Sequence, residues 1–196
     1  MIRKIAWMGM LLWCLGMMSA RADWMGNKFG PSLVNAKGMA VETAKALKGV
    51  KLIGIYFSAH WCPPCRQFTP QLVKFYQDCK KNKKSFEIVF VSFDHTAKDM
   101  SNYMTEAKMP WLALPYGSKF VEQLAKEYNV NGIPTLIILD QNGKLVSANG
   151  RVDVHSQGAK AYDSWTSRGG SRNGNPPSPP TPNKGKSGGK RKGKKK

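Results

Sequence analysis

Two cysteines separated by two prolines, Cys62-Pro63-Pro64-Cys65, are the most reactive side chains of the sequence. This spacing lets the two sulfurs meet in a small ring, and a thiolate beside a second thiol is suited to disulfide exchange. The pair lies where an apolar run gives way to an amphipathic stretch, which predicts that Cys62 begins a helix. We expect Cys62 to be exposed, with its thiolate favoured by unpaired amides and the helix macrodipole, and Cys65 to be covered by the first turn. Pro63 suits the first helical position because it has no amide hydrogen.

Other uses of such a pair are less favoured. A zinc site usually has four protein ligands, and beyond the pair the predicted domain offers only Cys79 and three scattered histidines. Covalent haem attachment requires a histidine directly after the second cysteine, where Arg66 stands. A structural disulfide is an alternative, but it would constrain a loop of only two residues. The pattern therefore favours a redox pair that uses no metal and no organic cofactor.

The surrounding segments predict alternating strands and helices. Apolar runs at residues 51–57 and 86–93 indicate buried strands, and the spacing of apolar residues from Phe68 to Cys79 indicates an amphipathic helix between them. Strand, helix and strand in this order predict a right-handed crossover with parallel pairing. Pro70 has no amide donor, so a kink is expected there. Further elements are expected in the segments that follow, namely helices at 98–107 and 119–128, a strand at 135–139 and an antiparallel return at 144–147.

Four further features have less reactive interpretations. Cys79 lies 14 residues after Cys65 on the predicted helix, about 21 Å away, so it cannot pair with Cys65 and is expected to be a buried, inert thiol. His60 either tunes Cys62 by its charge or is a solvent-facing loop residue. Trp111 is more typical of core or rim packing than of a binding platform. The lysines between 80 and 84 are expected to solvate a loop.

The formal net charge of +19 is concentrated at the two ends of the chain. Residues 1–22 combine a basic start, an apolar run from Ile5 to Met18 and the sequence Ala20-Arg21-Ala22, a pattern typical of a signal peptide cleaved before Asp23. An uncleaved anchor is the alternative. We therefore expect an exported protein, in a periplasm by preference and secreted as the alternative, where oxidised cysteines are permitted.

Residues 166–196 contain no large apolar side chain and are rich in glycine, proline and lysine. Such a segment buries too little apolar surface to offset its ordering entropy, so we expect a disordered tail after a domain at 23–165. The basic residues of 184–196 either contact a polyanion weakly or are solvated without a dedicated partner. No aromatic residue lies among them to stack on nucleic-acid bases.

The segment Tyr56-Phe-Ser-Ala-His-Trp-Cys-Pro-Pro-Cys-Arg66 resembles the active-site segment of the nucleoredoxin and tryparedoxin branch of the thioredoxin superfamily. The resemblance covers roughly residues 33–165. It implies an α/β protein of thioredoxin fold, with a central mixed sheet flanked by helices on both faces. The other matching motifs are Phe68-Thr-Pro70, Pro110-Trp-Leu-Ala-Leu-Pro115, Gly132-Ile-Pro-Thr135 and Asn149-Gly-Arg151.

The resemblance also implies the composition of the site. It makes Ile133–Pro134 a cis peptide bond with the proline ring beside the sulfurs, lets the backbone of Ile133 pair with a substrate segment, and has Trp61 shield the active-site sulfur. Tyr56 stands where ordinary thioredoxins carry a buried acid, so no proton acceptor for Cys65 is evident. His95 stands where tryparedoxins often have a glutamate. The expected environment of Cys62 and Cys65 is completed by their sequence neighbours Trp61, Pro63, Pro64 and Arg66.

These observations predict an exported thiol–disulfide oxidoreductase that acts as a monomer on disulfide-containing proteins together with an unidentified redox partner. We expect reduction of protein disulfides through a Cys62–Cys65 cycle. The reverse sequence of steps would oxidise client thiols, and the direction depends on the reduction potential of the pair, which the sequence does not define. Two alternatives are a peroxide-linked redox enzyme and a polyanion-binding protein that uses the basic tail. An intact pair of vicinal cysteines favours the oxidoreductase, because a scaffold has no need of one.

Overall fold

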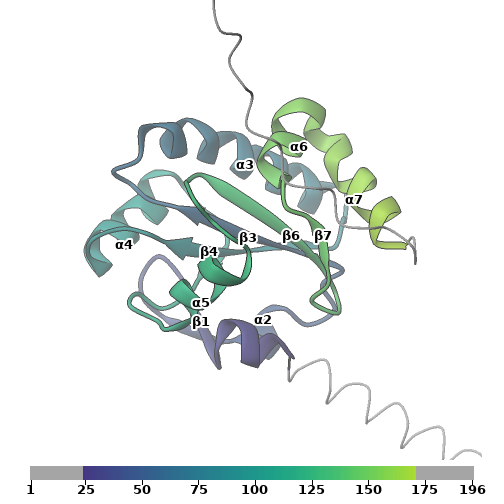
Figure 1. Cartoon of the computed structure of the whole chain (residues 1–196). Coiled ribbons are helices and arrows are strands. Elements are labelled where there is room, and N and C mark those ends of the chain that lie inside the picture. The colour runs from purple at the N-terminus through teal and green to yellow at the C-terminus, as the bar shows by residue number, and fades with distance from the viewer. Residues whose placement is uncertain (1–23, 171–196) are drawn as a thin grey trace, which may run out of the picture.

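The computed structural model describes residues 24–170, and seven strands of this part form one mixed sheet in the order β2-β1-β5-β4-β3-β6-β7 (Figure 1). Strands β3, β4 and β5 are parallel, whereas β6 pairs antiparallel with both β3 and β7. At the other edge β1 pairs antiparallel with β2 and β5. The strand bounds are β1 Ser32–Val34, β2 Ala40–Glu42, β3 Leu52–Ser58, β4 Phe86–Ser92, β5 Leu112–Ala113, β6 Thr135–Asp140 and β7 Leu145–Ser147.

Helices cover both faces of this sheet (Figure 1). Apolar side chains of α3, α4, α6 and α7 share one core with one face, and those of α2, α5 and the helical residues 24–29 share a second core with the other. This arrangement confirms the expected thioredoxin fold. The helix bounds are α2 Thr43–Ala46, α3 Pro63–Lys81, α4 Ala97–Glu106, α5 Phe120–Glu127, α6 Gly150–Gln157, the short 3₁₀ segment η1 Gly158–Lys160 and α7 Ala161–Gly170.

The central strand β3 shows why the sequence folds in this way. Every residue of β3 is buried, as expected for a strand covered on both faces. Successive side chains alternate between the two cores: Tyr56 lies in the core beneath α3, and Ile55 and Phe57 lie in the opposite one. The parallel pairing of β3 with β4 brings the C-terminal ends of both strands, Ser58 and Ser92, side by side at one edge of the sheet.

Helix α3 follows β3 and carries the apolar stripe that the spacing predicts. Its buried residues include Phe68, Leu72, Phe75 and Cys79, all of which belong to the core between this helix and the sheet. The helix extends without interruption from Pro63 to Lys81, and Pro70 lies inside it. The predicted strand–helix–strand unit is therefore confirmed.

The C-terminal part of the domain extends further than the sequence predicts. Helix α7 crosses the expected boundary at residue 165 and ends at Gly170, so the prediction of disorder is wrong for residues 166–170. Trp165 holds α7 in place: it is fully buried, packs against Phe75, and donates a hydrogen bond from Nε1 to Asp153 of α6 at 2.8 Å. Helix α6 in turn lies close on β6 because Gly150 has no side chain, and a Cβ there would meet the carbonyl oxygen of Leu136 at 2.8 Å.

The two ends of the chain lie outside the described residues. The predicted signal peptide at 1–22 and the remainder of the predicted tail, from residue 171 onward, fall there. Within residues 24–170 we find no helix with the length and apolar character needed to cross a membrane.

Candidate active site

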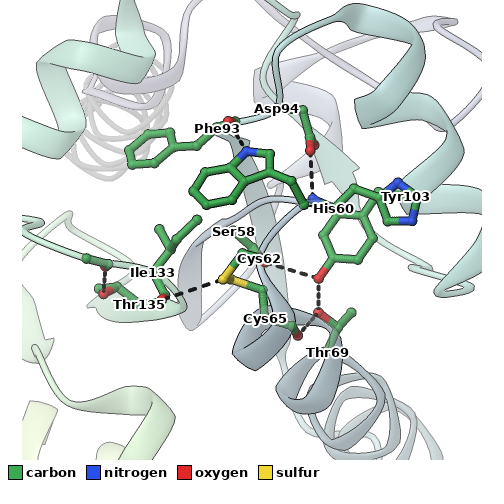
Figure 2. The surroundings of a disulfide bond; sticks show 12 residues. Ser58, His60, Cys62, Cys65, Thr69, Phe93, Asp94, Tyr103, Ile133 and Thr135 are labelled. Carbon is green, nitrogen blue, oxygen red and sulfur yellow. Dashed lines mark hydrogen bonds between the residues drawn. A yellow bond between two sulfur atoms is a disulfide. The ribbon is translucent and has the colours of Figure 1, made fainter.

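Cys62 and Cys65 form a disulfide at the N-terminus of α3, next to the C-terminal ends of β3 and β4 (Figure 2). Their Cα atoms are 5.2 Å apart, within the range usual for a disulfide. Cys62 is the N-cap residue with an extended backbone, and Pro63 occupies the first helical position, as its fixed φ angle favours. The sequence therefore predicts the position of the pair on the helix correctly.

Two details of this helix end differ from the expectation. Pro63 and Pro64 have no amide hydrogen, and the next two amides, those of Cys65 and Arg66, both donate to the carbonyl oxygen of Cys62 at 3.1 Å. In this oxidised form the first turn therefore has no unpaired amide that could donate to the sulfur of Cys62. For a thiolate at Cys62 in the reduced protein, the helix macrodipole is the remaining favourable contribution. In addition, Cys62 is only 3% exposed, because it packs with Ala59 and Cys65 and against the side chain of Ile133. Cys65 is fully buried, as expected.

Trp61 is the large exposed side chain beside the disulfide, with 53% of its surface accessible. Its Nε1 donates to the carbonyl oxygen of Phe93 at 3.0 Å, and its indole is stacked on the ring of His95 with centroids 5.8 Å apart. The hydroxyl of Tyr116, also exposed, donates to the carbonyl oxygen of His95 at 2.5 Å. The loop after β4 thereby connects Trp61 to the segment that precedes α5.

The loop after β4 is also bonded to the loop after β3 through Asp94, a residue that the sequence pattern does not indicate. Its buried carboxylate accepts from the backbone amide of His60 at 2.6 Å and from the hydroxyl of Ser92 at 2.7 Å. The imidazole of His60 stacks on Tyr103 and lies 3.0 Å from a carboxylate oxygen of Glu106. His60 is therefore turned toward α4 with 30% of its side chain exposed, so it is not the solvent-facing loop residue that one expectation described.

The segment before β6 lies on the other side of the disulfide. Ile133–Pro134 is a cis peptide bond, as the resemblance implies. The carbonyl oxygen of Ile133 is 3.8 Å from the sulfur of Cys62 (Figure 2). Since a disulfide sulfur carries no hydrogen, this distance describes a contact and not a hydrogen bond.

Four hydroxyl groups, those of Tyr56, Ser58, Thr69 and Tyr103, form a network next to Cys65 that the sequence does not indicate. Figure 2 shows three of them, those of Ser58, Thr69 and Tyr103. The hydroxyl of Thr69 is 2.9 Å from the carbonyl oxygen of Cys65, 2.7 Å from the hydroxyl of Tyr56 and 2.5 Å from that of Tyr103. Ser58 lies 3.1 Å from Tyr103. Burial raises the pKa of Tyr56 well above its usual value, so its phenol stays protonated. Of these four residues the sequence pointed only to Tyr56, which stands where ordinary thioredoxins carry a buried acid.

Two of the residues with less reactive interpretations lie away from the disulfide. Cys79 is a buried free thiol near the opposite end of α3, and burial raises its pKa to about 11. Trp111 is buried and packs on Tyr56 and Tyr76, which confirms core packing. It also lines a cavity of about 140 Å³ together with Glu87 at the start of β4, whereas the disulfide lies beyond the end of that strand. Among the described residues, no three His, Cys, Asp or Glu side chains are grouped so as to hold a metal ion.

A mixed sheet, a CxxC disulfide at the N-terminus of its main helix and a cis X-Pro bond whose preceding carbonyl contacts the first cysteine together define the thioredoxin class of proteins. Comparisons with known proteins support this class: the family model described as Thioredoxin-like matches residues 49–145. A solved thioredoxin from Wuchereria bancrofti is 42% identical with a TM-score of 0.60, and the match covers 69% of this chain and 94% of that one. Tryparedoxin II from C. fasciculata is 36% identical with a TM-score of 0.63, covering 73% of this chain and 91% of that one.

Curated relatives indicate to which branch of this class the chain belongs. The nucleoredoxin of Danio rerio is 44% identical over 126 residues, which are 64% of this chain and 29% of the relative. The probable nucleoredoxin 1 of Arabidopsis thaliana is 46% identical over 112 residues, which are 57% of this chain and 19% of the relative. The chain belongs to the thioredoxin-like family, in the branch of the nucleoredoxins and tryparedoxins. It spans less than a third of the length of these nucleoredoxins.

The relatives correct one expectation. The prediction of an exported, periplasmic or secreted protein is wrong, because the homologous nucleoredoxins are cytosolic or nuclear proteins. The prediction depended on a short basic and apolar pattern in residues 1–22. Such a pattern reflects amino-acid composition, and it does not by itself distinguish a cleaved signal peptide from another apolar segment.

Proposed function

We propose that this chain is a thiol–disulfide oxidoreductase that reduces disulfides in proteins through a Cys62–Cys65 cycle. The observation that carries the proposal is the disulfide at the N-terminus of α3, beside the carbonyl of Ile133 and the exposed face of Trp61. The family membership supports the same chemistry, since disulfide exchange is the reaction that a vicinal dithiol performs.

In the reducing direction, the thiolate of Cys62 attacks one sulfur of a client disulfide. A bond forms between Cys62 and the client, and the other client sulfur leaves as a thiolate that takes up a proton. Cys65 then loses its proton and attacks the sulfur of Cys62, which forms the Cys62–Cys65 disulfide and releases the second client thiol. A separate dithiol reductant must then return the pair to its reduced form.

The assignment of Cys62 as the attacking residue follows from its place in the helix. Cys62 is at the N-cap, where the macrodipole favours a negative charge, whereas Cys65 is fully buried one turn further on. The side chains of Ile133 and Phe93 pack against the cluster that contains Cys62, and the carbonyl oxygen of Phe93 accepts from the indole of the neighbouring Trp61.

Single cysteine variants test this proposal. Cys65→Ser should accumulate covalent adducts with client proteins that disappear on reduction, because no thiol remains to resolve the mixed disulfide. Cys62→Ser should form no adducts and should have no exchange activity, and Cys79→Ser serves as the control that behaves as the parent protein. Adducts in Cys62→Ser instead of Cys65→Ser would contradict the assignment.

A further inference from the structure

The hydroxyl network beneath Cys65 has only one consistent set of proton positions. The carbonyl oxygen of Cys65 can only accept, so the hydroxyl of Thr69 must donate to it at 2.9 Å. The oxygen of Thr69 then has two lone pairs left, and the phenols of Tyr56 and Tyr103 must donate to them. The oxygen of Tyr103 is left to accept from Ser58.

Each proton of the network is therefore directed toward Thr69 and, through it, toward the backbone of Cys65. No hydroxyl has a further donor to offer to the sulfur of Cys65. Tyr56 also stays protonated at neutral pH, because its burial disfavours the phenolate. The network therefore does not act as an acid or base for this sulfur, and its effect must come through the backbone.

The backbone of this turn has a particular need for such support. Pro70 cannot donate a hydrogen bond, so the carbonyl of Arg66 loses its helical partner directly after the turn that carries Cys65. Thr69 lies immediately before Pro70 and is fully buried. Through Tyr56 it connects this turn to β3, and through Tyr103 it connects the turn to α4.

We propose that Thr69 is a positioning residue for the resolving step, because its hydroxyl fixes the turn that holds Cys65 within reach of the mixed disulfide on Cys62. This inference rests on the proposed function. It concerns only the second half of the cycle, in which the thiolate of Cys65 forms a bond to the sulfur of Cys62 and the client thiolate leaves. The first half of the cycle is the attack by Cys62, and none of the hydroxyl bonds described above involves Cys62, so we expect that step to be unchanged when the hydroxyl of Thr69 is removed.

A single-turnover reaction separates the two steps. The reduced protein is mixed with a stoichiometric amount of a symmetric nitrobenzoate disulfide, which releases one coloured thiolate when Cys62 attacks and a second when Cys65 resolves. Thr69→Val keeps the shape of the side chain and removes the hydroxyl. We expect its second phase to slow by about three- to tenfold, the rate equivalent of one lost hydrogen bond, with the first phase unchanged.

Thr43→Val is the matched control. Thr43 is also buried and its hydroxyl also donates to a backbone carbonyl, that of Gly30, but it lies in α2 on the other face of the sheet. The control should lose stability with both phases unchanged, and Thr69→Ser should restore the second phase because it restores the hydroxyl. If Thr69→Val does not fold, Tyr103→Phe tests the same network, since it removes the bond that connects Thr69 to α4. We expect its second phase to slow with the first phase unchanged, and an unchanged second phase would overturn the role of the network.

The outcomes are distinguishable. A second phase as fast as in the parent for Thr69→Val, an equal slowing in Thr43→Val, or no recovery in Thr69→Ser would overturn the role of Thr69. Absence of the first phase from the parent protein would instead contradict the proposed function. A slowed second phase that serine restores supports both.

Discussion

The two ends of helix α3 contain the same reactive residue type in opposite circumstances. At its N-terminus, Cys62 and Cys65 form a disulfide among loops that connect β3, β4 and α4. Near its C-terminus, Cys79 is a free thiol in the apolar core between the helix and the sheet. The helix and the residue type are shared, so the difference in expected chemistry comes from the position of each cysteine along the helix.

Polar neighbours differ between the two ends as well. Around the disulfide, buried polar groups hold backbone: Asp94 accepts from the amide of His60, and Thr69 donates to the carbonyl of Cys65. At the other end, Trp165 packs on Phe75, and its indole Nε1 donates to the buried carboxylate of Asp153. The N-terminal end of α3 is built to place sulfur atoms, and the C-terminal end is built to hold the helix on the sheet.

The largest difference that we expect between the two ends is in thiol reactivity. Burial raises the pKa of Cys79 to about 11, and since the thiolate is the charged form, it becomes populated only as the pH rises toward that value. At neutral pH about one Cys79 side chain in ten thousand is ionised, roughly three hundredfold fewer than for an unperturbed cysteine. Because Cys62 lies at the helix N-terminus, where the macrodipole favours a thiolate, we expect it to react with iodoacetamide in the reduced protein at least about a hundredfold faster than Cys79.

Mass spectrometry of the alkylated peptides measures both rates across a pH series. The rate at Cys79 should rise about tenfold for each pH unit below its pKa. Comparable rates for Cys62 and Cys79 at neutral pH would remove the distinction between the two ends of the helix.

The second largest effect concerns stability at the C-terminal end. Asp153→Ala leaves the buried Nε1 of Trp165 and the buried hydroxyl of Ser147 without their acceptor, and each such group costs about 1–3 kcal/mol. We expect a loss of about 2–4 kcal/mol in the free energy of unfolding, measured by chemical denaturation. Disulfide exchange by the fraction that remains folded should be unchanged.

The matched control for this variant is Asp163→Ala. Asp163 also lies in this C-terminal region, in α7, but its bond to Lys84 is exposed, and exposed ion pairs contribute little. An equal loss in the free energy of unfolding of the two variants would show that the buried bond between Asp153 and Trp165 stabilises the domain no more than an exposed ion pair does.

The sequence predicted the N-terminal end of α3 better than its surroundings. The position of the pair, Pro63 at the first helical position and the apolar stripe of α3 all follow from local spacing, which periodicity detects directly. The burial of Cys62 was missed because it depends on Ile133, a residue 71 positions away in the chain. Asp94 and Thr69 were missed for the same reason, since their partners come from other elements of the fold.

Short and irregular elements could not be predicted from the sequence either. Strand β5 has two residues and exists because it pairs with β4 and β1, not because its own sequence favours a strand. The second half of α7, residues 166–170, was predicted to be the start of a tail because it lacks large apolar side chains. Its stability comes from Trp165 and from the anchor at Asp153, which only the folded structure brings together.

The smallest expected effect sharpens the contrast within α3 itself. The phenol of Tyr76, on the C-terminal half of the helix, donates to a carboxylate oxygen of Glu87 at 2.7 Å, and burial raises its pKa so that it remains a donor. Tyr76→Phe removes this bond and keeps the ring packed on Trp111, so we expect a loss of about 1 kcal/mol in the free energy of unfolding. Because Glu87 keeps its bond to Lys80, no carboxylate is left without a partner. Both phases of the single-turnover exchange should match the parent protein, and a change in either phase would show that the C-terminal half of α3 also positions the reacting sulfurs.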